Sequence, residues 1–267
     1  MKKQIFITGL MVILLSGCAT WKVPRTLGDP RNANTYGYHP LDPLPIKVEY
    51  LNENQPISNI RILNALPDET MRLAIGQVNS QGGVTFSSAS VGYEGSSYVV
   101  ILDYIKFNTN SFGVKLDTSG TDRYGKELKA SLTNSDNPDV IVPVYVGVGL
   151  RLTANITVNK GKVNLGNLFA LGLEANSEKI SGTLVVQTLG VSGENISSII
   201  PMPSEINPTT IQNAIMALAT IKSNLYDEKT IITPRVVGVY NNLGGGTETI
   251  NGFISSMLQQ PRPLYVP

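Results

Sequence analysis

The feature that most constrains the fold is a long run of alternating apolar and polar residues, VIVPVYVGVGLRLTANITV at residues 140–158. A period of two is typical of a β-strand with one apolar and one polar face. Strands usually have about five or six residues, so we expect an unusually long strand here. Its apolar residues are Val142, Val144, Val146, Val148, Leu150, Leu152, Ala154, Ile156 and Val158. The fold must cover this apolar face along its whole length.

The N-terminus reads MKKQIFITGLMVILLSGCAT. Two lysines precede a short apolar run, which is typical of a secretory signal and too short for a stable transmembrane helix. The run ends in LSGC, and Cys18 is the only cysteine of the chain. This segment resembles the lipobox of bacterial lipoproteins, in which the cysteine is acylated and becomes the new N-terminus. The resemblance implies a signal peptide over residues 1–17 and lipidation of Cys18. Because Ala19 is not an aspartate, it also implies an anchor in the outer membrane, with the body most simply on the periplasmic face.

Two arrangements would cover the apolar face of residues 142–158. In the first, the strand bends through Gly147 and Gly149 and packs on the core of a periplasmic body, since glycines permit bends and bulges. In the second, the strand and a partner after the turn NKGK form a hairpin over residues 142–175 that joins other subunits in an oligomeric export pore. A membrane strand needs about nine to eleven residues, which this segment has. It lacks aromatic belts, so we favour the core.

The remaining segments predict an α+β, β-rich fold with mostly antiparallel sheets and one main amphipathic helix. After residues 18–45, which form either a proline-rich tether or a strap along the body, a β-rich module is expected over residues 46–107. Polar residues 108–139 are either a linker or loops on one sheet. A second module over residues 140–267 contains the hairpin, the helix and a C-terminal strand, and the chain closes in an extended form.

The main helix is expected at residues 208–226. Asn207 fits the N-cap, and Pro208 fits the first helical position. One apolar face follows at helical spacing, formed by Ile211, Ala214, Ile215, Leu218, Ile221 and Leu225. Among the shorter segments, residues 57–63 predict a strand, while residues 67–76 fit either a helical turn or a strand.

Motifs for catalysis and metal binding are missing. The one histidine, His39, lies in the proline-rich segment and is expected to be solvated. One histidine and one cysteine cannot build a zinc site of several such ligands. The segment DTSGTD fails as an EF-hand loop, because Asp122 and Leu128 stand where glycine and glutamate are needed. We therefore expect no catalytic residue, no metal and no cofactor.

The charge balance excludes a nucleic-acid partner. Without Lys2 and Lys3 the chain keeps 19 of its 21 basic residues against 20 acidic ones, a net charge of −1, and no basic stripe remains. We expect a lipid-anchored outer-membrane protein with a non-enzymatic structural or adaptor role, whose partners are envelope proteins or further copies of itself. The alternatives are the export pore and a periplasmic hydrolase whose carboxylate or serine site has no local motif.

Overall fold

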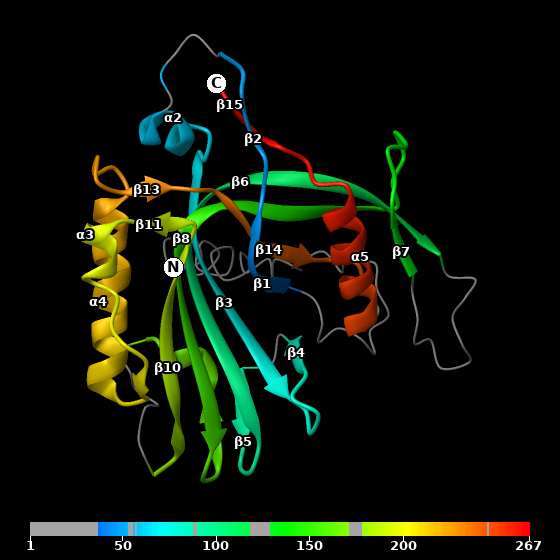
Figure 1. The fold of residues 1–267 in the computed structure, drawn as a ribbon. Coiled ribbons are helices and arrows are strands. Elements are labelled where there is room, and N and C mark those ends of the chain that lie inside the picture. Colours follow the sequence, from blue (N-terminus) through cyan, green and yellow to red (C-terminus); the bar gives the residue numbers. More distant parts are fainter. Residues whose placement is uncertain are drawn as a thin grey trace, which may run out of the picture.

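The computed structural model describes residues 37–52, 56, 58–87, 90–117, 129–170, 178–244 and 246–267. Half of the structure is strand, most strand pairs are antiparallel, and a few helices accompany them, which confirms the β-rich α+β class. A nine-stranded sheet has the main order β1-β14-β8-β6-β3-β4, with β10, β12 and β7 attached at its sides (Figure 1). Its strands are β1 (Gly37–Pro45), β3 (Asp68–Val78), β4 (Val84–Ser87), β6 (Ser97–Asp117), β7 (Lys129–Leu132), β8 (Val140–Val158), β10 (Ile180–Leu189), β12 (Ser204–Glu205) and β14 (Arg235–Asn241).

Three small two-stranded sheets and the helices complete the described structure. Strands β2 (Val48–Tyr50) and β15 (Leu264–Val266) form a parallel pair. The other two pairs are antiparallel: β5 (Val91–Tyr93) with β9 (Lys162–Asn164), and β11 (Val191–Ser192) with β13 (Ile231–Ile232). The helices are α2 (Asn59–Asn64), the short 3₁₀ helix η2 (Leu165–Asn167), α3 (Glu194–Ser197), α4 (Pro208–Asn224) and α5 (Thr247–Gln259). Among the described residues, no helix is both long and apolar enough to cross a bilayer.

The length of β8 follows from its position between three strands. Along one edge it pairs with β6 from one end to the other, and the two strands sweep together towards β7 (Figure 1). Along the other edge it pairs first with β14, up to Gly147, and then with β10, from Gly149. A Cβ at Gly149 would lie 1.9 Å from the Tyr104 carbonyl oxygen, so only glycine permits the close approach of β6 at this change of neighbour.

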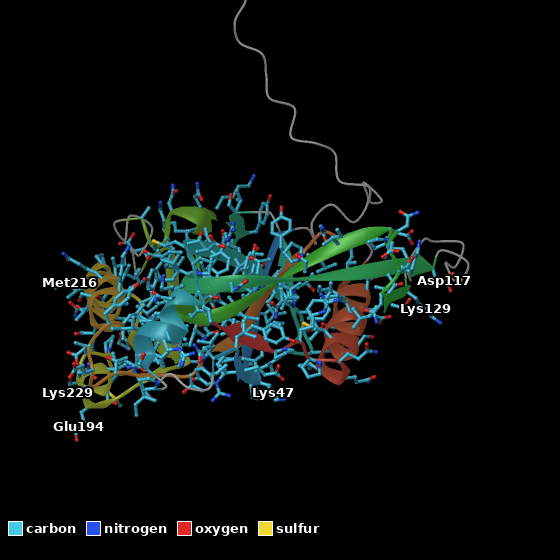
Figure 2. All side chains as sticks on the ribbon, turned by 90° about the horizontal axis from the view of Figure 1, so that it is seen from above. Lys47, Asp117, Lys129, Glu194, Met216 and Lys229 are labelled. Carbon is cyan, nitrogen blue, oxygen red and sulfur yellow. The ribbon has the colours of Figure 1, made fainter. Side chains whose placement is uncertain are left out.

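The sheet has a core on each face. On one face, the even-numbered residues of β8 join the main core together with α4, and α4 contacts β8 and β10. The opposite face carries a smaller core built by Tyr38, Ala74, Ile101, Ile105, Phe107, Tyr145, Leu189 and Val237. Seen from above, Met216 and Glu194 lie near one end of the molecule, and Asp117 and Lys129 lie near the other (Figure 2).

The main helix forms where the sequence predicts it. In α4 the Asn207 side chain accepts a hydrogen bond from the Thr210 N–H at 3.0 Å, and the Thr210 hydroxyl accepts one from the Asn207 N–H at 3.0 Å, a reciprocal capping box. Pro208 begins the helix. Proline has no backbone N–H, and a donor at this first position would have had no intrahelical partner. Of the predicted face, only Ile215 is half-buried, and the other members are buried.

Two segments differ from the prediction. The strand expected at residues 57–63 is wrong: residues 59–64 form α2, which Ser58 caps by accepting a hydrogen bond from the Arg61 N–H. The second correction is α5, which the sequence analysis did not predict. Its buried residues Ile250, Phe253 and Met257 follow helical spacing, but the preceding glycines and the short length obscure that pattern.

The expected division into modules does not match the described chain. The boundary at residue 107 falls inside β6, which continues to Asp117 and pairs with β8 on both sides of that point. Of the two alternatives for the proline-rich segment, residues 37–45 follow the strap: they form β1 against β14, and Tyr38 is buried. Of residues 67–76, all but Pro67 belong to strand β3, which settles the other open alternative in favour of the strand.

Candidate functional site

The nine apolar residues predicted on one face of the long strand all lie in the protein interior. Val142, Val144, Val146, Val148, Leu150, Leu152, Ala154, Ile156 and Val158 are each at most 2% exposed. The expected hairpin partner is wrong, because after the turn residues 162–164 form β9 and leave to pair with β5. The antiparallel partner of this part of β8 is β10, further along the chain. Cys18 lies outside the described residues.

His39 is not the solvated side chain that its proline-rich surroundings suggested. It lies in β1, is partly buried, and packs edge-on against Phe86 with ring centroids 5.1 Å apart. Burial lowers the pKa of His39 to about 4, because the charged imidazolium is poorly solvated there. The ring is therefore neutral at pH 7 and acts as a packing group of the strap.

A buried polar network links four strands, β1, β6, β8 and β14, on the face opposite α4. Asp103 on β6 and Arg151 on β8 are directly opposite in register and are 0% and 3% exposed. The Arg151 guanidinium donates from Nε to Asp103 Oδ1 and from Nη2 to Asp103 Oδ2, both at 2.7 Å. From β1, the Tyr38 hydroxyl donates to Asp103 Oδ2 at 2.5 Å. Such a bidentate pair is among the stronger charge-assisted hydrogen bonds.

The rest of the Arg151 guanidinium bonds the backbone of the strap and its neighbour. Nη1 donates to the Leu41 carbonyl at 2.7 Å, and Nη2 also donates to the Val237 carbonyl at 3.0 Å. Burial, followed by the Asp103 carboxylate, raises the pKa of Tyr38 well above its usual range, so the hydroxyl stays a donor. The network joins β1 and β14 to the centre of the sheet, and its enclosed carboxylate is placed to hold strands together rather than to meet a substrate.

The sequence analysis missed this network, although a signal was present. Asp103 is the one acidic residue within the apolar run SYVVILDYIKF, and a charge in such a run must find a partner once buried. Arg151 is one of the polar residues that alternate with the apolar ones in 140–158, and the polar face is itself covered by the smaller core. The two residues are 48 positions apart, so only strand register brings them together.

A second polar cluster lies where the end of α4 meets the start of β3. Lys222 of α4 forms an ion pair with Glu69 of β3, and its ammonium group lies 5.8 Å from the ring centroid of Tyr104 on β6. Burial, followed by the charge of Glu69, raises the pKa of Tyr104. Both members of the ion pair are over one third exposed, so this contact fastens the helix to the sheet only weakly.

Three carboxylates among the described residues, Asp139, Asp227 and Glu228, make local contacts. Asp227 and Glu228 line a hollow of about 380 Å³ beside α2, but they are consecutive, exposed residues of one turn, and Asp227 Oδ1 accepts a hydrogen bond from the Lys229 N–H of that turn. Asp139 pairs with Lys115 at 2.8 Å. Asp122 and Leu128 lie outside the described residues. Within the described ranges, no three His, Cys, Asp or Glu side chains gather as metal ligands.

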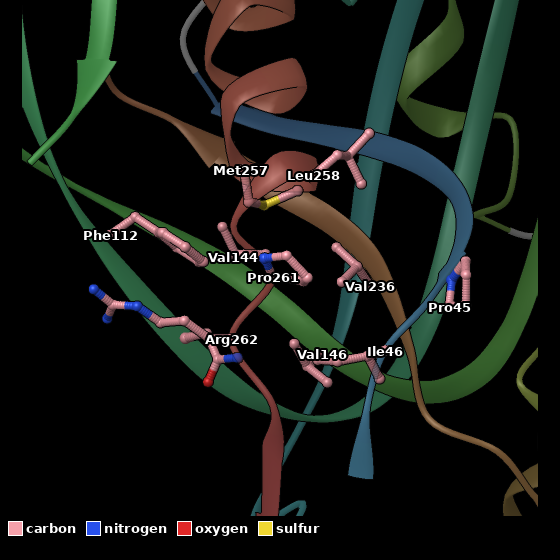
Figure 3. Close-up of a pocket in the computed structure, with 11 residues that line it drawn as sticks. Pro45, Ile46, Phe112, Val144, Val146, Val236, Met257, Leu258, Pro261 and Arg262 are labelled. Carbon is pink, nitrogen blue, oxygen red and sulfur yellow. The ribbon is translucent and has the colours of Figure 1, made fainter.

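An apolar pocket lies between α5 and the sheet, beneath the turn that joins β1 to β2 (Figure 3). Its cavity volume is about 20 Å³, which is room for about one water molecule and far below the volume of ligand sites. Met257 and Leu258 of α5 line it together with Pro45, Ile46, Asn110, Phe112, Val144, Val146, Val236, Pro261 and Arg262. The Arg262 guanidinium stacks on Phe112, 4.7 Å from its centroid, and donates to the Ser111 carbonyl at 2.6 Å. The pocket thus offers packing surface and no nucleophile or general base.

No protein-family model, no curated protein sequence and no solved structure matches the chain.

Proposed function

We propose that the protein is a lipid-anchored lipoprotein on the periplasmic face of the outer membrane, where it has a non-enzymatic structural or adaptor role in a cell-envelope assembly. The anchor is the diacylated Cys18, the last residue of the LSGC box. A protein held by several acyl chains stays at the bilayer stably. The folded body then works through contacts with other envelope proteins.

The observation that carries the non-enzymatic part of the proposal is the use of the buried charges. Asp103 and Arg151 bond each other, Tyr38 and the backbone of β1 and β14, so they stabilise the body itself. An active site usually needs ionisable groups that a substrate can reach within a recess. The apolar pocket of Figure 3 offers Arg262 and Asn110 as its polar side chains, and the Arg262 guanidinium already bonds Ser111.

The covered strand favours the adaptor over the export pore. In a pore, the apolar residues of a membrane hairpin would face lipid, alternating with residues that face the lumen. Here the even-numbered residues of β8 pack in the main core, while Arg151 on the other face is enclosed by the smaller core. Exposing the even-numbered face to a membrane would require α4 and the rest of the main core to move away from β8, and exposing the other face would require the smaller core to open.

Membrane fractionation of three proteins tests the anchor. The wild type should appear in the outer-membrane fraction, and Cys18→Ser should be released into the soluble fraction with changed mobility. Ala19→Asp is the matched variant, because an aspartate after the acylated cysteine favours retention in the inner membrane in the lipoprotein family. Cys18→Ser protein that remains in the outer membrane would refute the anchor.

The mass of the detergent-extracted protein tests the adaptor role. We expect a small assembly, or a complex with another envelope protein that survives purification. A ring many times the mass of the chain, found only in detergent, would support the export pore instead.

A further inference from the structure

Among the described residues, one edge of the large sheet lacks a strand partner along part of β3. On one side, β3 pairs with β6 over residues 68–77. On the other side, β4 pairs only with residues 75–78, and no strand of the described residues pairs with the seven residues 68–74. An open strand edge is a template for pairing with another extended chain.

The register shows which backbone groups point out of this edge. The Asn79 N–H donates to the Gly83 carbonyl across the β3–β4 hairpin, so the odd-numbered residues of β3 direct their N–H and C=O groups towards the β4 side. The hydrogen bond from the Val158 N–H to the Ser96 carbonyl leads to the same alternation through β6. Glu69, Met71 and Leu73 therefore present the outward donors and acceptors.

Side chains along this edge are unusually apolar for an open position. Met71 is 54% exposed and Leu73 is 40% exposed, on the same face of β3. Strand β1, at the other end of the described strand order, carries Pro40, Pro43 and Pro45, residues that blunt strand pairing. The open part of β3 contains no proline, and its charged residues are Asp68, Glu69 and Arg72.

We propose that the open edge of β3 is a homodimer interface, in which a second copy of the chain adds its own β3 in antiparallel orientation about a two-fold axis at Met71. The seven open residues have Met71 as their midpoint, and Met71 is one of the residues whose backbone groups point outwards. Residues 68–74 of the partner thus pair with residues 68–74 of the first copy, and their strand ends where β4 begins to pair at residue 75. A self-complementary patch of this kind gives a closed dimer.

The charges fit this antiparallel pairing. With Met71 opposite itself, Glu69 lies opposite the partner's Leu73, and Asp68 lies diagonal to the partner's Arg72 on the other face. Long side chains reach such diagonal neighbours. Arg72 stacks on Tyr145 at 5.4 Å, and its buried Nε has no hydrogen-bond partner among the described residues, so an added acceptor is favourable there. The dimer goes beyond the proposed adaptor role and does not depend on the lipid anchor.

Disulfide trapping tests the axis directly. In the full chain with Cys18→Ser, which leaves no other cysteine, Met71→Cys places two thiols across the axis. The Cα atoms of a hydrogen-bonded antiparallel pair are about 5.5 Å apart, within the range of a disulfide. The control is Met216→Cys, equally exposed on the outer side of α4 (Figure 2). We expect a linked dimer with Met71→Cys and monomer with Met216→Cys.

Two further variants separate loss of the interface from loss of the fold. Met71→Pro removes an outward N–H and leaves the β6 ladder intact, and Met71→Lys places like charges at the axis. Sedimentation of the Cys18→Ser protein should show a dimer that both variants convert to monomer, with wild-type circular dichroism. A monomeric parent protein, or equal trapping at positions 71 and 216, would overturn the proposal. A different protein disulfide-linked at position 71 instead would also overturn it, because the edge would then serve a foreign strand.

Discussion

Asp103 and Arg151 face each other across β6 and β8 and share two hydrogen bonds of 2.7 Å in the interior of the sheet. Burying two charges carries a large desolvation cost, which this bidentate geometry offsets only while both partners are present. The pair also accepts the Tyr38 hydroxyl and bonds the Leu41 carbonyl, so it fixes where the strap crosses the sheet. The pair therefore positions the strap as well as stabilising the sheet.

Removing one partner of this pair should strongly destabilise the protein. We expect Arg151→Met to lower the free energy of unfolding by about 3–5 kcal/mol, because it leaves the Asp103 carboxylate buried and unpaired. The double variant Asp103→Leu/Arg151→Met should recover most of that loss. Urea unfolding measures both. As a control, Lys115→Met breaks the exposed pair with Asp139 and should cost less than about 1 kcal/mol. A double variant no more stable than Arg151→Met would contradict the account.

Acid should weaken the attachment of the strap through His39. Its folded pKa of about 4 lies below the ordinary value of 6.5, so the neutral form is favoured in the folded state. The stabilisation is complete above pH 6.5 and is lost as the pH falls towards 4, since the unfolded chain takes up the proton first. The variant His39→Phe keeps a ring against Phe86 and should lose less stability than wild type across this window. If wild type and His39→Phe lose stability in the same way as the pH falls, His39 is solvated in the folded protein.

The buried face of α4 should be sensitive to charge and its outer face tolerant. Ile221 is 0% exposed and Met216 is 60% exposed on the same helix. We expect Ile221→Asp to lower the free energy of unfolding by several kcal/mol, because an unpaired carboxylate enters the core. Met216→Asp should change it by less than about 0.5 kcal/mol. Thermal unfolding of the two variants measures the difference. If Ile221→Asp and Met216→Asp shift the midpoint equally, the helix does not pack as described.

A charge on the covered face of β8 should unfold the soluble protein itself. Leu150 is 0% exposed in the main core, whereas Asn155 on the same strand is exposed. In the Cys18→Ser protein, we expect Leu150→Asp to abolish the native circular dichroism and Asn155→Asp to preserve it. If Leu150→Asp keeps wild-type stability and size in solution, the apolar face of β8 must be free for another environment.

The parts of the fold that the sequence predicts correctly depend on local pattern. The alternation of residues 142–158 determines which side chains share a face, since a slip by one residue would turn the whole set over. The helix α4 was predictable because Asn207, Pro208 and its apolar face lie within one segment. The short helix α2 was missed because its six residues carry little periodicity. The helix α5 was missed although Ile250, Phe253 and Met257 follow helical spacing, because the glycines before it indicate a loop.

The sequence by itself determined the LSGC box that ends in Cys18, the sidedness of β8 and the position of α4, because each depends on residues close together along the chain. Only the tertiary structure decided what covers the two faces of β8. It pairs β8 with β10 instead of the adjacent β9, and it places Tyr38 and Arg151 around Asp103. These contacts join residues that are far apart in the sequence, and strand register, which no local pattern encodes, brings them within hydrogen-bonding distance.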